Sequence, residues 1–258
     1  MTESVKAAVL GLVQGLTEFF PISSSAHLKV FRILLEQEVE SLPFDVSVHL
    51  ATLLAVLIYF WRDIARILRG PDLFPVGLRL FLATLPSVAI GFLLKSSRET
   101  LSPWFIVAGW TFSASYLLLT RGREGSADYP RFPLGRILCI GLAQSLAIFP
   151  GVSRSGSTIC AGLWLELTRE SAARFSFLLT IPAILRACIL SGMDLIQSPN
   201  SHESLYAAAA IAMPFAFVSG LLAIHLLLRT VRSDHFHRFG WYNLAAAVAF
   251  AAYLLSQV

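Results

Sequence analysis

The chain has 258 residues, of which 56% are hydrophobic and only 14% are charged, and its net charge is +4. Soluble domains carry about 25% charged residues, so the composition excludes an ordinary soluble domain and indicates an integral membrane protein. No basic run indicates nucleic-acid binding. The three cysteines (Cys139, Cys160, Cys188) lack the CxxC spacing or histidine partner expected of a metal or disulfide set.

Residues 4–20 are predicted to form an apolar helix that carries one carboxylate, Glu18. A proline and three serines then interrupt it, and a short amphipathic helix is expected over 27–35. The first segment is marginal as a membrane span, so we predict a re-entrant hairpin whose serine-rich tip lines a cavity. An unpaired charge in hydrocarbon costs at least ~2.5 kcal/mol. The alternative is that Glu18 is an interfacial residue that reaches lipid headgroups.

Six later segments are long and apolar enough to cross the hydrocarbon core of a bilayer. Three follow the first hairpin, at about 45–61, 76–94 and 104–120. A second hairpin is predicted at 134–149 and 157–165, around the sequence PGVSRSG. It is followed by spans near 173–191, 205–228 and 240–256.

The two hairpins resemble each other in sequence. GLVQGLTEFFPISSS, which starts at Gly11, matches GLAQSLAIFPGVSRS, which starts at Gly141, at seven of fifteen positions without a gap. We interpret this as an internal duplication, with repeat one at about 1–128 and repeat two at about 129–258 of a single membrane domain. Three crossings per half would invert the second copy. The predicted fold is therefore an all-α polytopic membrane protein, an inverted repeat in which each half has one re-entrant helical hairpin and three transmembrane helices.

Loop charge predicts the orientation. One set of loops (62–75, 121–136, 165–174 and 229–239) holds twelve Lys and Arg residues, and the opposite set holds five. The positive-inside rule assigns the first set to the cytoplasm and both termini to the outer face.

Facing hairpin tips would form a pocket for a phosphorylated group. Arg154 can clamp phosphate oxygens, and His27 is a general base or the nucleophile itself. Glu18 could orient His27, handle a proton or hold a divalent cation. The predicted catalytic set is Glu18, Ser24, His27 and Arg154, and the predicted binding set is Gln14, Ser23, Ser25, Ser153, Ser155 and Ser157. For Asp45 and His49, at the start of a span, a structural role is preferred to catalysis.

Four stretches resemble the undecaprenyl-diphosphate phosphatase family, also called bacitracin-resistance proteins. They are QGLTEFFPISSSAH, PGVSRSGSTI, FDVSVHLATLLAVLIYFWRDI and TRESAARFSFLLTIP. The resemblance implies a multi-pass enzyme of the bacterial cytoplasmic membrane whose site opens to the outer face. It implies hydrolysis of undecaprenyl diphosphate to the monophosphate and phosphate, which recycles the carrier lipid for cell-wall synthesis. It also implies a divalent cation, Mg²⁺ or Ca²⁺, and that bacitracin acts on the lipid substrate rather than on the protein. Whether the chain forms a homodimer is left open.

The family's functional residues fall on matching positions of this chain. Its (Glu/Gln)-x-x-x-Glu pattern falls on Gln14 and Glu18, its serine pair and histidine on Ser23, Ser24 and His27, and its arginine on Arg154. Two residues of this chain differ from those usual in the family. Gln14 replaces a second glutamate found in many relatives, so this helix cannot supply a two-carboxylate metal site. Ala26 replaces the usual glycine before the histidine, which matters if that residue needs positive φ.

A transporter is the competing interpretation. Inverted repeats with interrupted helices at the midplane also build secondary transporters, so a lipid-phosphate flippase or an anion transporter could use Arg154 for binding alone. The sequence favours the enzyme because a carrier has no need of a Glu–Ser–His set beside its anion clamp.

Overall fold

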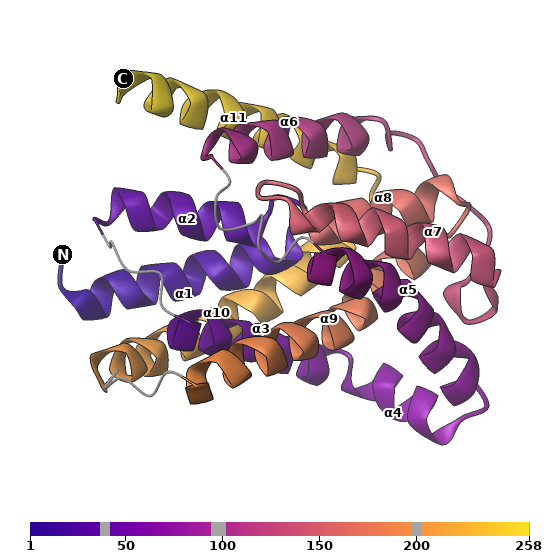
Figure 1. Cartoon of the computed structure of the whole chain (residues 1–258). Helices are drawn as coiled ribbons and strands as arrows, with labels where there is room; N and C mark the ends of the chain where they lie inside the picture. The colour runs from indigo at the N-terminus through magenta and orange to yellow at the C-terminus, as the bar shows by residue number, and fades with distance from the viewer. Residues whose placement is uncertain (37–41, 94–101, 198–202, 258) are drawn as a thin grey trace.

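The computed structural model describes residues 1–36, 42–93, 102–197 and 203–257. Within these ranges the chain is a bundle of α-helices without strands (Figure 1). The elements that form the bundle are α1 (Glu3–Phe19), α2 (Ser24–Leu34), α3 (Leu42–Tyr59), α4 (Trp61–Arg69), α5 (Leu73–Leu93), α6 (Trp104–Leu118), α7 (Leu134–Ser145), α8 (Arg154–Trp164), α9 (Arg169–Gln197), α10 (Glu203–Arg232) and α11 (Phe239–Ser256). Three short 3-10 helices accompany them, η1 (Tyr129–Arg131), η2 (Leu146–Ile148) and η3 (Phe236–Arg238).

The predicted class, an all-α multi-pass membrane protein, is confirmed. Four apolar stretches in the described residues are long enough to cross a membrane, at Leu73–Leu93, Arg169–Ile189, Ala207–Arg232 and Phe236–Ser256. A fifth candidate is α3 together with α4. The remaining predicted crossing, at about 104–120, is the 15-residue helix α6, which rises only about 22 Å and is therefore shorter than a full span.

The predicted loop at 62–75 is wrong in part, because it contains helix α4. This helix bends by 68° from α3. Its apolar side chains, such as Trp61 and Leu68, lie on one face and its arginines on another, which is the pattern of an amphipathic helix. From the sequence alone, the arginines of this segment indicated a polar loop. In the structure their spacing places them along one side of a helix.

Both predicted hairpins are present as two helices joined at a break. The second helix of each begins three residues earlier than predicted, at Ser24 in α2 and at Arg154 in α8. The side chain of Ser153 accepts a hydrogen bond from the Gly156 N–H at 3.1 Å, which is the capping interaction that serine favours at a helix start. Ser24 and Arg154 therefore occupy first helical turns rather than loops.

The first helix of each hairpin packs on a helix from the other half of the chain. Helix α1 lies against α10, and a Cβ atom added at Gly11 would come within 2.3 Å of the Ala212 carbonyl oxygen. Helix α7 lies against α5, and a Cβ atom at Gly141 would come within 2.6 Å of the Ala83 carbonyl oxygen. The matched glycines thus make matched close contacts. The inverted orientation of the halves stays a prediction.

Helices α6 and α11 lie side by side over the two hairpin breaks (Figure 1). Both termini lie at the same end of the molecule, and α4 lies at the far end (Figure 1).

Candidate active site

The centre of the candidate site is the carboxylate of Glu18, near the end of α1. One oxygen, Oε1, accepts a hydrogen bond from Arg154 at 2.7 Å. The other, Oε2, accepts from Ser24 Oγ at 2.7 Å and from Gln14 Nε2 at 3.0 Å. Only 7% of the Glu18 side chain and 16% of the Arg154 side chain are exposed. A buried carboxylate is tolerated when it is paired in this way.

The structure therefore brings together four residues from the two hairpins that the sequence predicted to form the site. We call Gln14, Glu18, Ser24 and Arg154 the Glu18 cluster. Ser24 is the first residue of α2 and Arg154 is the first residue of α8, so two helix N-termini meet at one carboxylate. The backbone N–H groups of a first helical turn have no partner within the helix, and helix N-termini favour anions.

Two further residues contact the Glu18 cluster that sequence reasoning did not assign to it. Thr180 of α9 accepts a hydrogen bond from the Arg154 guanidinium. His49 of α3 places Nε2 3.8 Å from Glu18 Oε2, while its Nδ1 donates to the Asp45 carbonyl oxygen at 2.7 Å. His49 was singled out from the sequence, but a structural role was preferred for it. The distance between His49 and Glu18 depends on how α3 packs beside α1, which the sequence alone does not show. Asp45 forms an ion pair with Arg32.

His27 makes its hydrogen bonds away from Glu18. Its Nδ1 lies 2.8 Å from the Ser23 carbonyl oxygen and must donate to it, so in the neutral ring Nε2 accepts from the Tyr242 hydroxyl at 2.8 Å. The ring is 5% exposed and packs against Trp110 and Tyr242, with centroids 5.1 and 5.7 Å away. Among the described residues, no hydrogen bond joins Glu18 to His27. The orienting contact predicted between these two side chains is therefore not observed.

The remaining serines stabilise the hairpin tips. Ser23 and Ser25 bring their hydroxyls within 3.3 Å, and Ser153 and Ser155 repeat this contact at 3.2 Å. Ser157 donates to the Arg154 carbonyl oxygen at 3.0 Å. Substrate binding by these side chains stays a prediction.

Backbone geometry at the first tip is unusual. Ser23 has φ of +68°, a region that costs a residue other than glycine about 1–3 kcal/mol and that tends to occur at functional sites. Ala26 lies inside α2 and is not among the described residues with positive φ. The expected difficulty with alanine at that position therefore does not arise.

Helices α6 and α11 hold both tips in place through buried hydrogen bonds. Trp110 donates to the Ile22 carbonyl oxygen at 2.8 Å, and Asn243 donates to that of Pro21 at 2.9 Å. At the second tip, Tyr116 donates to the Ser153 carbonyl oxygen at 3.1 Å. The short helix α6 thus contacts both hairpins.

The described residues contain no group of three or more His, Cys, Asp or Glu side chains that could hold a metal ion by themselves. One oxygen beside Glu18 is nevertheless available. The buried Gln14 Oε1 has no hydrogen-bond partner among the described residues. Amide and carboxylate oxygens suit Mg²⁺ and Ca²⁺, and Mg²⁺ is commonly bound by one or two carboxylates together with substrate phosphates. The donor set fits a cation that the substrate helps to hold.

Comparison with known proteins points to one family. Residues 7–249 match the family described as "Bacitracin resistance protein BacA". A protein named undecaprenyl-diphosphatase from Rhodopirellula baltica is 36% identical over 251 residues, which cover 96% of this chain and 97% of that protein. Proteins of the same name from Desulfosudis oleivorans and Rubrobacter xylanophilus are 38% and 39% identical and cover 93% and 99% of this chain. The chain, with its paired hairpins and the Glu18 cluster between them, belongs to the bacitracin resistance protein BacA family.

Proposed function

We propose that this protein hydrolyses undecaprenyl diphosphate to undecaprenyl phosphate and inorganic phosphate, which recycles the carrier lipid for cell-wall synthesis. The observation that carries the proposal is the 2.7 Å hydrogen bond from Ser24 to Glu18, whose carboxylate is also bonded by Arg154. A hydroxyl on a carboxylate base, beside a guanidinium and two helix N-termini, is a suitable arrangement for attack on a phosphate. The relatives named undecaprenyl-diphosphatase supply the substrate.

Substrate binding begins at Arg154. Its guanidinium carries five N–H donors, of which one is used by Glu18 and one by Thr180. The remaining donors can bind oxygens of the terminal phosphate, and the first-turn N–H groups of α2 and α8 can bind others. These contacts place the phosphorus atom next to Ser24.

The chemical step follows from that placement. Glu18 takes the proton of the Ser24 hydroxyl, and Ser24 Oγ forms a bond to the terminal phosphorus. The bond between that phosphorus and the bridging oxygen breaks, Glu18 passes its proton to that oxygen, and undecaprenyl phosphate leaves. Glu18, ionised again, then takes a proton from water, whose oxygen forms a bond to the phosphoserine phosphorus. The bond to Ser24 Oγ breaks, Glu18 returns the proton to that oxygen, and inorganic phosphate leaves. Arg154 compensates negative charge throughout, which is the main requirement of phosphoryl transfer.

The geometry favours Ser24 over His27 as the nucleophile. Both ring nitrogens of His27 are occupied, by the Ser23 carbonyl oxygen and the Tyr242 hydroxyl. Attack by His27 would first require the Tyr242 bond to break and the ring to turn. We assign His27 to holding the first hairpin in position.

A divalent cation, Mg²⁺ or Ca²⁺, would be held by the Glu18 carboxylate and the free amide oxygen of Gln14, together with diphosphate oxygens. It would supply additional positive charge to the leaving group.

The site is proposed to open to the outer face of the bacterial cytoplasmic membrane. The arginine-rich loops support this orientation, as does the position of both termini at the opposite end of the molecule from α4 (Figure 1). A reporter fused to the C-terminus should be active only outside the cytoplasm, and a cytoplasmic reporter would contradict the assignment.

The function is tested by phosphate release from purified protein in detergent, where no gradient exists. The enzyme should release phosphate from undecaprenyl diphosphate over many turnovers and leave undecaprenyl phosphate intact. A flippase or anion transporter would release none. A panel of prenyl diphosphates and nucleoside diphosphates then separates a lipid phosphatase from a general one.

A further inference from the structure

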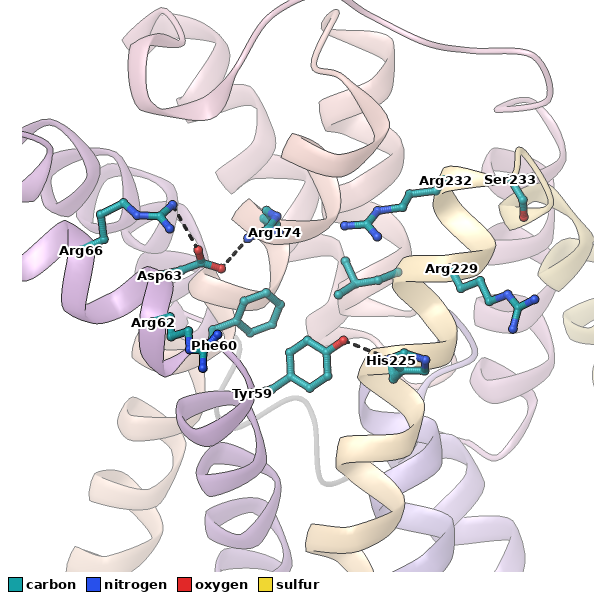
Figure 2. A pocket seen from close by; sticks show the side chains of 11 residues that line it. Tyr59, Phe60, Arg62, Asp63, Arg66, Arg174, His225, Arg229, Arg232 and Ser233 are labelled. Atoms are coloured by element: carbon teal, nitrogen blue, oxygen red, sulfur yellow. Dashed lines mark hydrogen bonds and ion pairs between the residues drawn. The ribbon is translucent and has the colours of Figure 1, made fainter.

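A second cationic region lies at the α4 end of the molecule, away from the termini. Between the α3–α4 bend and helices α9 and α10 there is a cavity of about 600 Å³ (Figure 2). Its walls include five arginines, which we call the arginine pocket: Arg62, Arg66, Arg174, Arg229 and Arg232. None of the five belongs to the Glu18 cluster.

The arginine pocket carries more positive than negative charge. Arg66 and Arg174 approach Asp63 from opposite sides (Figure 2). Arg174 and Arg232 each donate to Glu170 Oε1 at 2.8 Å. Five arginines against these two carboxylates leave a formal surplus of three positive charges. The surplus positive charges around the cavity repel one another and attract anions.

Two of the arginines are outside this ion-pair network. Within the described parts of the chain, no carboxylate lies within ion-pair distance of Arg62 or Arg229. Arg62 instead lies over the ring of Trp61, 5.5 Å from its centroid. These two side chains have donors that an incoming anion can use without breaking an existing ion pair.

The surroundings place the pocket at a membrane surface. Arg229 and Arg232 occupy the last turn of α10, where a candidate span ends. Trp61, at the start of α4, is 58% exposed, and tryptophan is enriched where spans leave the bilayer. The side chains of Tyr59, Phe60 and Leu228 form the apolar part of the lining. A pocket with this lining suits a ligand that has an anionic head and an apolar body.

A group of buried aromatic rings lies between the pocket and the Glu18 cluster. Phe60, which lines the pocket, packs on Phe177 with ring centroids 5.5 Å apart, and Phe177 packs on Phe19 at 5.8 Å. All three side chains are at most 2% exposed, and Phe19 is the neighbour of Glu18 in the chain. An apolar layer therefore separates the two polar regions, and the pocket is a site of its own.

We propose that the arginine pocket binds the phosphate group of an anionic phospholipid at the cytoplasmic surface of the membrane. A zwitterionic headgroup is disfavoured because its ammonium group would add to the positive surplus. An anionic headgroup lowers the positive surplus by its own charge and bridges the end of α10 and α4. Anionic lipids of the cytoplasmic leaflet attract arginines near the surface in this way.

The test compares lipid binding to a charge-reduced variant and to a matched control. Arg62→Gln with Arg229→Gln removes two charges from the pocket and keeps the Asp63 and Glu170 ion pairs. Arg121→Gln with Arg131→Gln removes two charges from exposed positions outside the pocket lining. Native mass spectrometry of purified protein in detergent measures the binding of short-chain phosphatidylglycerol, phosphatidylcholine of the same chain length, and inorganic phosphate.

The pocket variant should bind phosphatidylglycerol about 30-fold more weakly than the unchanged protein, since each arginine near a surface contributes appreciably to lipid affinity. The control should bind it unchanged, and phosphatidylcholine should bind weakly to all three proteins. Phosphate release by the pocket variant should stay within twofold, so the result does not depend on the phosphatase proposal. Equal binding of phosphatidylglycerol to variant and control would overturn the inference. Inorganic phosphate binding as tightly as the lipid would also overturn it.

Discussion

The Glu18 cluster and the arginine pocket both combine arginines with carboxylates, but they do so in opposite ways. In the cluster one arginine meets one carboxylate, and both side chains are largely buried. In the pocket three of the five arginines share two carboxylates, and the side chains of Arg66, Arg232 and Glu170 are 78%, 53% and 43% exposed. Breaking a buried pair costs about 3–5 kcal/mol, whereas an exposed pair contributes about 0–1 kcal/mol.

The difference indicates what each region can do. A matched and buried pair has a fixed geometry, which is what holding a reacting phosphate requires. In an open region with surplus positive charge, the side chains are not held in one arrangement. Such a region suits reversible binding of anions. The predictions below test whether activity depends on the first region and is insensitive to the second.

The largest effect is expected from Ser24→Ala. Loss of the proposed nucleophile should lower kcat for phosphate release by at least about 10⁴-fold, because the remaining groups can only assist water. Ser115→Ala, on an exposed part of α6, is the control and should leave kcat unchanged. A Ser24→Ala enzyme that keeps more than a tenth of its activity would show that Ser24 is not the nucleophile.

Glu18→Gln should come next. The amide keeps the size of the side chain but cannot take the Ser24 proton, and positioned bases contribute about 10²–10⁴-fold. We expect kcat to fall by about 10³-fold, measured as phosphate release. Glu124→Gln, at an exposed position near the arginine-rich end, should have no effect. Equal loss in both variants would point to a general sensitivity to charge rather than to a base at Glu18.

A smaller effect is expected from Tyr242→Phe. The change removes the hydroxyl that donates to His27 Nε2 and keeps the ring that stacks on it. A hydrogen bond contributes about 1 kcal/mol, so kcat should fall by about fivefold, with KM little changed. Tyr253→Phe on the same helix is the control. An unchanged kcat would show that the Tyr242 bond does not position His27 for activity.

Gly15→Ala should affect stability rather than chemistry. Its new Cβ would lie 2.0 Å from Ser219 Oγ and 2.3 Å from the Ala216 carbonyl oxygen, so α1 would have to move from α10. Overpacking of this kind lowers the free energy of unfolding by about 1–3 kcal/mol. Thermal unfolding in detergent measures it. Gly77→Ala is the control, because a Cβ added there would meet no described atom within 4 Å other than its own stretch of helix. Equal stability of the two variants would contradict the close packing of α1.

Much of this site could be predicted because the chain repeats itself. A carboxylate just before the break of one copy and an arginine just after the break of the other indicated that Glu18 and Arg154 meet. The helical start at Ser24 was missed because a run of serines also suits a loop, and only the backbone shows which serine begins the helix. The arginines of α4 were counted as loop charges because a charged segment between two apolar ones also suits a loop.

The remaining partners depend on packing between distant helices. Tyr242 is 215 residues from His27 in the chain, and Thr180 reaches Arg154 from α9. Periodicity predicts which face of a helix is apolar, but it does not say which neighbour that face meets. His49 was noticed for its chemistry, and its place beside Glu18 became visible only when α3 was packed next to α1.

The most direct test of the account compares phosphate release from undecaprenyl diphosphate by Arg154→Ala and by Arg232→Ala, purified in the same detergent. Both variants lose one arginine that bonds a glutamate. We predict that Arg154→Ala loses about 10³-fold or more of kcat/KM, as for other arginines that stabilise phosphoryl transfer, while Arg232→Ala stays within twofold. Near-full activity of Arg154→Ala, or an equal loss in both, would contradict the assignment of catalysis to the Glu18 cluster.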